Sequence, residues 1–465
     1  MGLFDDFDEV SHQHWTEKII KDLKGKDFNE NLIWNSIEDI AVQPFYNQES
    51  LTNNRSKDYT VPNNTNHWKI RSQVDTTNIS DANSKALFLL SRGCNSIQFN
   101  GQISSQNDFN TLLKGIDIDI IHVHFYNSNP TQTLVFLTHF CELNRLNLKD
   151  INSSVGYDYL GELLLSGNWN TNEKEDLEQF YQLNLQKNQF KTILVNGLYF
   201  NNAGATITQE LAYSFSQAVF YLNTLLEKGI DINAVANKIS FNFGIGSNYF
   251  FEIAKIRAAK ILWKLILNEY GVTNADAHIH ATTSSTNYSS FDAHNNILRA
   301  TTEAMSAIIG GANSISVVPF NVNYESSSDF SERIAINVQH ILKEEVFLDK
   351  VADASKGAYY IENLTDEIVN KSLTLFQNIE QNGGFLANIK NGVIQNSIHK
   401  VANQKQEEYK KGTRILLGVN KHQNKSTNKH ILSKSKSSTN QTLITVLEQV
   451  VFANKIESTF QATNA

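Results

Sequence analysis

The chain has 465 residues, of which 41% are hydrophobic, so it can bury the core of one large barrel or of two or three domains. Its formal net charge of −8 gives no broad basic surface of the kind that nucleic acid or an anionic membrane requires. The start MGLFDDFDEVSHQHW lacks the basic and apolar regions of a signal peptide, and no stretch of the sequence approaches the length of an apolar membrane span. The two cysteines, Cys94 and Cys141, are too few for a disulfide framework. We therefore expect a cytoplasmic protein whose partner is a small molecule or another protein.

Residues 1–79 are predicted to form an extended or helical arm that precedes the main domain. Trp15, Trp34, Trp68 and the turn Pro44–Tyr46 stand there in an otherwise polar context. Aromatic anchors on an arm suit the surface of a partner protein. An arm folded back on its own domain explains the same pattern, so both interpretations stay open.

Residues 80–420 are predicted to form the main domain, because short β-branched runs alternate there with longer amphipathic stretches. In the longer stretches apolar residues recur at spacings of three and four, which predicts helices. The predicted helices include Ile207–Glu227, Phe250–Asn268, Asn295–Ile309 and Ser331–Glu345. The eight predicted strands are Ser96–Asn100, Asp119–His124, Ile151–Val155, Thr192–Asn196, Lys238–Phe243, Ala277–Thr282, Ser314–Val318 and Ala358–Ile361.

Eight strands with intervening helices fit a closed β/α barrel of the TIM type. An open, doubly wound sheet is the alternative. No G-x-G-x-x-G or Walker loop follows any predicted strand, so an open sheet would lack its usual phosphate-binding turn. The pattern therefore favours the α/β fold class in its barrel form.

Residues 421–465 are predicted to form a short C-terminal tail. The stretch 420–441 is rich in Lys, Ser and Asn and is typical of a solvated linker. After it, Leu443–Phe460 has the pattern of one amphipathic helix. We expect no further domain.

Two pairs of histidines are candidates for a metal site. His122 and His124 alternate along one predicted strand and His278 and His280 along another, so each pair faces one side of the sheet. Such pairs resemble the first ligands of amidohydrolase-type metal barrels, which need further His, Lys and Asp ligands at later strands. Those ligands are not evident, so hydrogen-bonded histidines that line the barrel are favoured and a metal-dependent hydrolase is the alternative.

Arg257 is a candidate for anion binding. It follows the glycine-containing turn Phe243–Asn248 and lies near a predicted helix start. An anion at such a place can meet backbone N–H groups and a guanidinium. The glycines also permit a tight turn without a ligand, so a phosphate site and a structural arginine both stay open.

Short motifs from residue 202 onward follow one another in an ordered series. They are Asn202–Ala205, Thr208–Tyr213, Phe251–Ala259, Leu262-Trp263, Asn295–Arg299, Thr302–Met305, Gly310-Gly311, Arg333–Ala335, Asn337, Gln339, Lys350–Asp353, Tyr359-Tyr360 and Gly418–Lys421. In order and spacing the series resembles the methylmalonyl-CoA mutase family. The N-terminal match is thinner, although Trp68–Arg71 and the segment from Ala82 to Gly93 are similar to the smaller subunit of the heterodimeric forms.

The resemblance implies a barrel through whose axis an acyl-CoA passes, capped by a separate adenosylcobalamin domain. Catalytic family members carry a Tyr-His pair before the Ala-Gly-Ala motif, where this chain has Leu198 and Tyr199. The tyrosine that shields the radical site is Gln73 here, and the glutamine of a His-Cys-Gln-Thr strand is Thr282. We expect these four replacements to remove catalysis, because each lost oriented group costs powers of ten in rate.

At some positions that contact the ligand in the family, this chain has the same residue as the family. Arg71 and Arg257 match positions on the CoA side, and His280 keeps the imidazole of its strand, so all three are candidates for residual acyl-CoA binding. The arginine that binds the substrate carboxylate has no counterpart in Ser153–Leu160, which removes a bidentate carboxylate site.

Cobalamin binding in the family uses an Asp-x-His-x-x-Gly loop whose histidine ligates cobalt. Asp276-Ala-His278 and Asp292-Ala-His294 match its first three positions but lack the glycine and lie within the barrel pattern. We therefore expect no cobalamin-binding domain on this chain, no resident metal, and adenosylcobalamin on a partner.

The sequence as a whole predicts a non-catalytic small subunit of a heterodimeric mutase, inactive alone. Its partner would be a larger catalytic subunit that interconverts methylmalonyl-CoA and succinyl-CoA. One alternative is a catalytic barrel that uses a separate cobalamin protein, and the other is the metal-dependent hydrolase.

Overall fold

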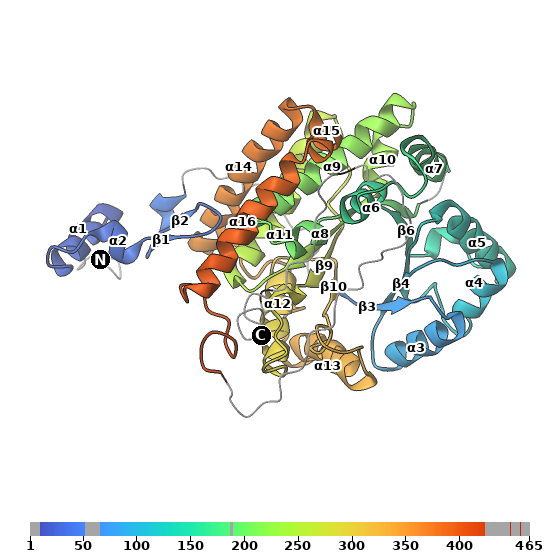
Figure 1. Ribbon diagram of the computed structural model, residues 1–465, viewed down its shortest axis with the longest axis horizontal. Coiled ribbons are helices and arrows are strands. Elements are labelled where there is room, and N and C mark those ends of the chain that lie inside the picture. The colour runs from blue at the N-terminus through green and yellow to red at the C-terminus, as the bar shows by residue number, and fades with distance from the viewer. Residues whose placement is uncertain (1–9, 52–65, 187–188, 424–446, 448–455, 457–465) are drawn as a thin grey trace, which may run out of the picture.

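The computed structural model describes residues 10–51, 66–186 and 189–423, together with Leu447 and Ile456. These residues form one β/α barrel and an N-terminal arm that projects from it (Figure 1). Within these ranges, no helix is long and apolar enough to cross a membrane.

Most of the predicted C-terminal tail, 421–465, lies outside the described residues. The same holds for the predicted linker at 420–441 and for the predicted helix Leu443–Phe460, apart from single residues. The absence of a cobalamin-binding domain therefore stays a prediction.

Eight parallel strands close the barrel in the order β10-β3-β4-β5-β6-β7-β8-β9, which confirms the predicted TIM-type architecture. A separate antiparallel pair, β1 (Trp34–Asn35) and β2 (Ala41–Val42), forms a hairpin at the base of the arm. The barrel strands are β3 (Lys69–Asp75), β4 (Ser96–Asn100), β5 (His122–Tyr126), β6 (Ser153–Tyr157), β7 (Lys191–Asn196), β8 (Ile239–Ile245), β9 (Ile279–Thr283) and β10 (Ser314–Ser316).

Helices surround the barrel and extend beyond it (Figure 1). The α-helices are α1 (His12–Asp22), α2 (Phe28–Leu32), α3 (Ile79–Ser91), α4 (Gln106–Leu112), α5 (Pro130–Leu143), α6 (Tyr159–Ser166), α7 (Glu173–Leu185), α8 (Leu198–Asn202), α9 (Ile207–Glu227), α10 (Ile232–Lys238), α11 (Tyr249–Glu269), α12 (Asn295–Ile309), α13 (Asp329–His340), α14 (Tyr359–Gln381), α15 (Gly384–Lys390) and α16 (Val393–Lys410). Short 3-10 turns occur at η1 (Gln48–Ser50), η3 (Leu148–Asp150) and η4 (Ser285–Asn287), and η5 (Ile341–Glu345) is a π-helix.

The predicted helices are confirmed, and two of them have the predicted bounds. Helix α9 starts at Ile207 because Thr206 and Gln209 form a reciprocal capping box at its N-terminus. Helix α12 also spans the predicted residues, and α11 is one residue longer at each end than predicted. The predicted helix Ser331–Glu345 is α13 followed by the π-helical turn η5.

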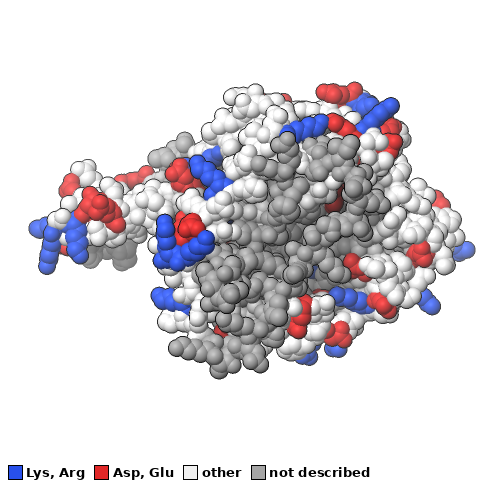
Figure 2. All heavy atoms as spheres, viewed as in Figure 1, with Lys and Arg blue, Asp and Glu red and all other residues white. Residues whose placement is uncertain are grey.

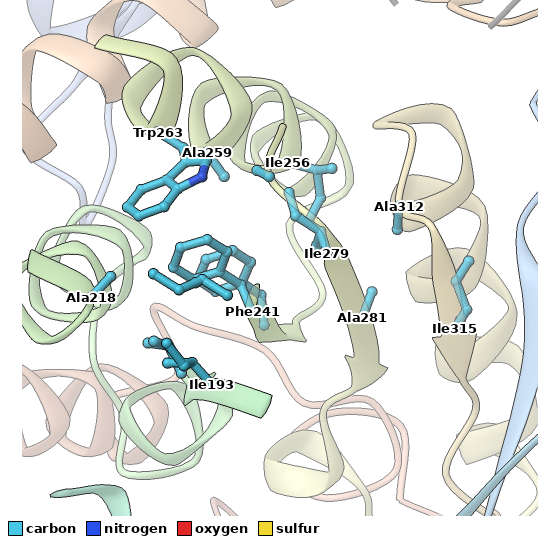
Figure 3. Close-up of a cluster of buried hydrophobic side chains, with 14 of the residues drawn as sticks. Ile193, Ala218, Phe241, Ile256, Ala259, Trp263, Ile279, Ala281, Ala312 and Ile315 are labelled. Atoms are coloured by element: carbon cyan, nitrogen blue, oxygen red, sulfur yellow. The ribbon is translucent and has the colours of Figure 1, made fainter. Parts of the chain in front are cut away.

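The hydrophobic core lies between the outside of the barrel and its helices (Figure 3). Phe241 of β8 and Ile279 of β9 point outward, away from the axis, and pack beneath α11. Trp263 of α11 packs edge-on against Phe241, with ring centroids 5.1 Å apart. Because the outward faces of the strands supply this apolar packing, the side chains on the inward faces can be polar.

The predicted strand Ala358–Ile361 is wrong. These residues begin α14, a 23-residue helix that packs on α9 and α11. Tyr359, Tyr360 and Ile361 favour strands by propensity, but helix-spaced burial of Ile361, Leu364 and Ile368 against the barrel helices outweighs that preference.

The strand that the prediction missed is β3, which lies inside the segment 1–79 assigned to the arm. It pairs with β4 and with β10 and so closes the barrel. In β3 the apolar residues Ile70 and Val74 point outward into the core, while Arg71 and Gln73 face the axis. Such alternation is typical of a half-exposed strand, so it does not indicate that both faces of β3 belong to the barrel.

The arm itself consists of α1, α2 and the hairpin. Helices α1 and α2 contain no buried residue and lie apart from the ring of helices in Figure 1. The hairpin is attached more firmly, since Ile40 and Val42 are buried in the core.

The described part of the face in Figure 2 carries Lys and Arg interspersed with Asp and Glu. No extended field of one sign occurs on that part of the surface.

Candidate functional site

The interior of the barrel is lined by polar side chains. In most β/α barrels this space is filled by layers of branched apolar residues. Here polar side chains from every barrel strand meet at the axis, which is typical of a site and not of a structural core. They are Arg71 and Gln73 on β3, Gln98 and Asn100 on β4, His124 and Tyr126 on β5, Ser154 on β6, Asn196 on β7, Asn242 on β8, His280 and Thr282 on β9, and Ser316 on β10.

A cavity of about 370 Å³ lies at the amino ends of the strands, and we call it the amino-end cavity. Its wall includes residues at or before strand starts, such as Lys149, Lys191 and His278. All four histidines of the predicted pairs line it, so both pairs belong to one site. Among the described residues that line this cavity, none is Asp or Glu.

Arg71 is the central cation of the amino-end cavity. Its side chain donates from Nη2 to His124 Nε2 at 2.8 Å and from Nε to Ser96 Oγ at 3.3 Å. Burial lowers the pKa of Arg71 to about 9, because the charged guanidinium loses hydration. The guanidinium is therefore held in place by neutral groups.

The contact with Arg71 fixes the protonation of His124. A guanidinium can only donate, so His124 Nε2 accepts and the ring hydrogen is on Nδ1. Nδ1 then donates to Ser154 Oγ at 2.7 Å. Burial, followed by the charge of Arg71, holds the pKa of His124 well below its usual range, so the ring is neutral.

His280 and His278 lie on the other side of the same cavity. His280 Nδ1 lies 2.9 Å from Ser314 Oγ, and its Nε2 lies 3.2 Å from Ser316 Oγ. Burial lowers the pKa of His278 to about 3 and also holds that of His280 well below 6.5. Both histidines line the cavity, which confirms the prediction that they line the barrel, and the hydroxyl contacts belong to His280.

A second cavity, of about 290 Å³, lies at the carboxyl ends of the strands, and we call it the carboxyl-end cavity. It is lined by Asp75, Asn100, Tyr126, Tyr157 and Glu162, among others. The two cavities thus differ in charge, since carboxylates occur only among the described lining residues of this one. Tyr126 lines both cavities, and we call the boundary at this residue the wall at Tyr126.

Tyr126 is held in that wall by a carboxylate and a second phenol. Its hydroxyl donates to Glu162 Oε1 and lies 3.0 Å from the hydroxyl of Tyr199. Tyr199 in turn lies 3.5 Å from Glu162 Oε1. Burial first, and then the nearby carboxylates, raise the pKa of Tyr199, so both phenols stay protonated donors.

The four replaced family positions do not form one cluster. Tyr199 joins the wall with Tyr126, whereas Leu198 beside it on α8 is half-buried and carries no polar group. Gln73 accepts from Asn100 Nδ2 at 3.2 Å and is exposed. Thr282 donates to Asn242 Oδ1 at 3.0 Å in the barrel interior.

Arg257 lies outside both axial cavities. Its guanidinium, 1% exposed, donates to Asp353 and, at 3.1 Å, to Glu362 Oε1. These contacts join α11 to α14 and to the loop before it. Of the two interpretations of Arg257, this pairing with two carboxylates favours the structural arginine.

The histidines offer no site for a metal ion. Within the described residues, no group of three or more His, Cys, Asp or Glu side chains is arranged to hold one. The rings of His122 and His124 are 6.4 Å apart and tilted, and His124 Nε2 is already bonded to Arg71.

Tyr126 and Glu162 are the site residues that the sequence prediction missed. Tyr126 lies two residues after His124 on one strand, so the alternation used for the histidines places all three on the same face. Glu162 lies on α6, and the sequence carried no signal for it.

Comparison with known proteins shows to which family this chain is similar. The family profile described as methylmalonyl-CoA mutase matches residues 100–461. The chain belongs to the methylmalonyl-CoA mutase family. It is 38% identical over 440 residues to a protein named methylmalonyl-CoA mutase small subunit from Porphyromonas gingivalis, covering 91% of this chain and 71% of that protein.

Other members of the family match over a shorter length. The methylmalonyl-CoA mutase of Rhizobium meliloti is 36% identical over 237 residues, which are 50% of this chain and 33% of that protein. The methylmalonyl-CoA mutase large subunit of Porphyromonas gingivalis is 34% identical over 53% of this chain and 35% of that protein. Membership of a mutase family supports an isomerase role in general.

Proposed function

We propose that this chain is the non-catalytic small subunit of a methylmalonyl-CoA mutase and supports a larger subunit that isomerises methylmalonyl-CoA and succinyl-CoA. The observation that carries the proposal is the wall at Tyr126. Tyr199, at the position of the family's catalytic imidazole, is held in that wall by Tyr126 and Glu162. An acyl-CoA that enters at the amino end would meet this wall before it reaches the carboxyl end, where family chemistry occurs.

Neither of the two described motifs that resemble a cobalt-binding loop fits adenosylcobalamin, so we assign that cofactor to the partner. His278, in the first motif that resembles a cobalt-binding loop, lines the amino-end cavity. His294, in the second, lies against the ring of Phe320, with centroids 5.6 Å apart. Neither stands in the cobalt-binding loop that the family uses.

The N-terminal arm is the proposed contact with the larger subunit. Trp15 of α1 stacks on Phe45 at 4.7 Å, but α1 contains no buried residue. A helix of 11 residues is marginal in water unless its apolar side packs on something. A partner surface supplies that packing, and two subunits named large and small occur together in Porphyromonas gingivalis.

Arg71 and His280 remain candidate contacts for an acyl-CoA at the amino end. Both line the amino-end cavity, and a guanidinium suits the phosphates or carboxylates of such a ligand. Because the wall at Tyr126 separates this cavity from the carboxyl end, we propose binding without turnover.

We also propose that the complex of this chain with the larger subunit is cytoplasmic.

The deciding experiment is co-expression of this chain, carrying a tag, with the larger mutase subunit of the same organism. We expect equal amounts of both chains to be recovered, with turnover of methylmalonyl-CoA in the complex and none in the isolated chain. Turnover by the isolated chain with adenosylcobalamin or a separate cobalamin protein would refute the proposal in favour of a catalytic barrel. Stoichiometric zinc in the purified chain would favour the hydrolase.

A further inference from the structure

A groove of about 700 Å³ lies at the carboxyl ends of β8 and β9, outside the two axial cavities. It is bounded by the hairpin of the arm, by the loops that follow β8 and β9, and by the C-terminal half of α16, and we call it the α16 groove. The hairpin and α16 are neighbours in Figure 1. None of the described residues that line the groove lines either axial cavity, so the groove is a separate feature of the fold.

The α16 groove carries apolar side chains that the barrel does not bury. Trp34 of the hairpin is 51% exposed, Ile415 after α16 is 45% exposed, and both line the groove. Tyr409 of α16 also lines it and forms a small apolar cluster with Leu416 and Val419, separate from the main core. Exposed apolar side chains gathered around a groove are typical of a surface on which another polypeptide packs.

The groove also contains a buried acceptor that lacks a donor. Asn287, which lines the groove, is 5% exposed and donates from Nδ2 to Glu303 Oε1 at 2.8 Å. Its Oδ1 has no hydrogen-bond partner among the described residues. Because a buried acceptor without a donor is unfavourable, an occupant with N–H or O–H groups suits this side of the groove better than a purely apolar one.

The C-terminal part of the chain reaches this groove. Ile456 lines it, donates from its backbone N–H to the carbonyl of Thr286 at 3.0 Å, and packs on the cluster that contains Tyr409. Leu447 is buried in the main core, and its backbone N–H donates to the carbonyl of Gly167, which follows α6. Two residues of one short segment are therefore attached to the barrel at two different places.

The sequence around Ile456 has further apolar residues at helical spacing. Phe452 and Phe460 stand four residues before and four residues after it, within the predicted helix Leu443–Phe460. Both phenylalanines lie outside the described residues. Because residues four apart share one face of a helix, the sequence predicts that all three side chains point to the same side. Such a face suits the exposed apolar side chains of the groove.

We propose that the α16 groove is the docking site of this chain's own C-terminal segment, residues 448–465, with Ile456 as the central anchor. The segment covers Trp34 and Ile415, and one of its polar groups donates to Asn287 Oδ1. The predicted linker 420–441 tethers the segment, which gives it an effective concentration of about 1 mM at the groove. This goes beyond the proposed subunit function and does not depend on it, since either can fail without the other.

The first test compares the full chain with Ile456→Glu and Ser458→Glu. A glutamate at 456 places a charge in an apolar contact and should release the segment. Ser458 is the matched control, because two residues further along the predicted helix its side chain faces away from Ile456. We expect amide hydrogen exchange in peptides that contain Thr286 or residue 456 to quicken by at least about tenfold in Ile456→Glu, and to stay unchanged in Ser458→Glu.

A second measurement identifies the occupant. A labelled synthetic peptide of residues 448–465 is titrated with the full chain and with Ile456→Glu, and its fluorescence anisotropy is followed. We expect the peptide to bind Ile456→Glu at least about tenfold more tightly, because in the unaltered chain the tethered segment competes for the groove. A peptide of the same residues in scrambled order is the control and should bind neither protein.

Three results would overturn the proposal. They are equal exchange in all three proteins, equal or absent binding of the peptide by the two chains, and a dimer of the unaltered chain that Ile456→Glu converts to monomers. The last result, measured by analytical ultracentrifugation, would mean that the segment occupies the groove of a second copy. If Ile456→Glu does not fold, as judged by circular dichroism, Ile415→Glu on the groove side replaces it with the same expected release.

Discussion

Two buried arginines show how differently one residue type is used in this chain. Arg257 is paired with Asp353 and Glu362, and the three side chains join helices outside the barrel. Arg71 faces the axis among neutral side chains. The charge of Arg257 is therefore balanced by two carboxylates, whereas the hydrogen-bond partners of Arg71 are neutral.

The pair of carboxylates around Arg257 predicts a large loss of stability on substitution. Arg257→Met would leave Asp353 and Glu362 buried without a cation, and we expect the free energy of unfolding to fall by about 3–5 kcal/mol. Urea denaturation measures this change. Arg92→Met is the control, because Arg92 is exposed and stacks on Phe88, and its expected change is below about 0.5 kcal/mol. A loss for Arg257→Met as small as that of the control would contradict the structural role.

The buried histidines predict a pH dependence of stability. Burial first, and then the charges of Lys191, Arg71 and His122, lower the pKa of His278 from 6.5 to about 3. As the pH falls below about 6.5 the unfolded chain takes up a proton that the folded chain does not, so stability is lost toward acid. His278→Asn removes this contribution.

Unfolding by urea at about pH 7 and about pH 5 checks the sign of this effect. We expect the stability lost between the two values to be smaller in His278→Asn than in the unaltered chain. His139→Asn is the control, since His139 is exposed on α5 and its replacement should leave the loss unchanged. An equal loss in all three proteins would show that His278 is charged when folded.

Within the arm, the hairpin packs on the barrel, whereas helices α1 and α2 contain no buried residue. Glu38, in the hairpin, accepts from the backbone N–H groups of Ile207 at 2.8 Å and Thr208 at 3.0 Å, so it caps α9. Helices α1 and α2 make no comparable buried contact. The hairpin therefore stabilises the barrel, whereas the two helices are available to a partner.

Removal of residues 1–32 tests this division. The truncated chain keeps the hairpin and is expected to unfold within about 2 °C of the full chain, because the removed helices α1 and α2 contain no buried residue. Its association with the larger subunit should weaken by at least about tenfold, as expected when anchoring aromatic residues are removed. Lys18→Ala, on the exposed face of α1, is the control. Undiminished association would place the contact elsewhere on the barrel.

At the scale of the whole molecule, the described barrel contains two cavities, one toward each end of its strands. The amino-end cavity is cationic, the carboxyl-end cavity contains Asp75 and Glu162, and Tyr126 lies between them. In a barrel that threads an acyl-CoA the two spaces would have to be continuous. The hydrogen bonds of Tyr126 to Glu162 and Tyr199 hold the wall in place.

Tyr126→Ala should open the passage. We expect the affinity for coenzyme A to rise by about tenfold, because the long pantetheine chain gains space to extend. Tyr126→Phe is the matched control, since it keeps the ring and removes only the hydroxyl. An equal response of the two variants would show that the ring is not the barrier.

Much of the fold was predictable because it rests on local patterns. The bounds of α9 and α12 follow from helical spacing and, for α9, from a capping box in adjacent residues. The two errors among the strands share one cause. Whether β3 and the start of α14 join a sheet depends on residues far along the chain that become their neighbours. The strand propensity of the segments themselves carries no information about those neighbours.

The sequence by itself determined the family and the barrel, and it predicts the loss of the catalytic residues, since these depend on which side chains occur and in what order. Only the tertiary structure decided what the remaining polar residues do. Arg71 and Arg257 look alike in the sequence, yet folding gave one two carboxylates and the other none. The physical reason is that the protonation and the pairing of a buried charged group depend on the groups around it. Residues distant in the chain supply those groups.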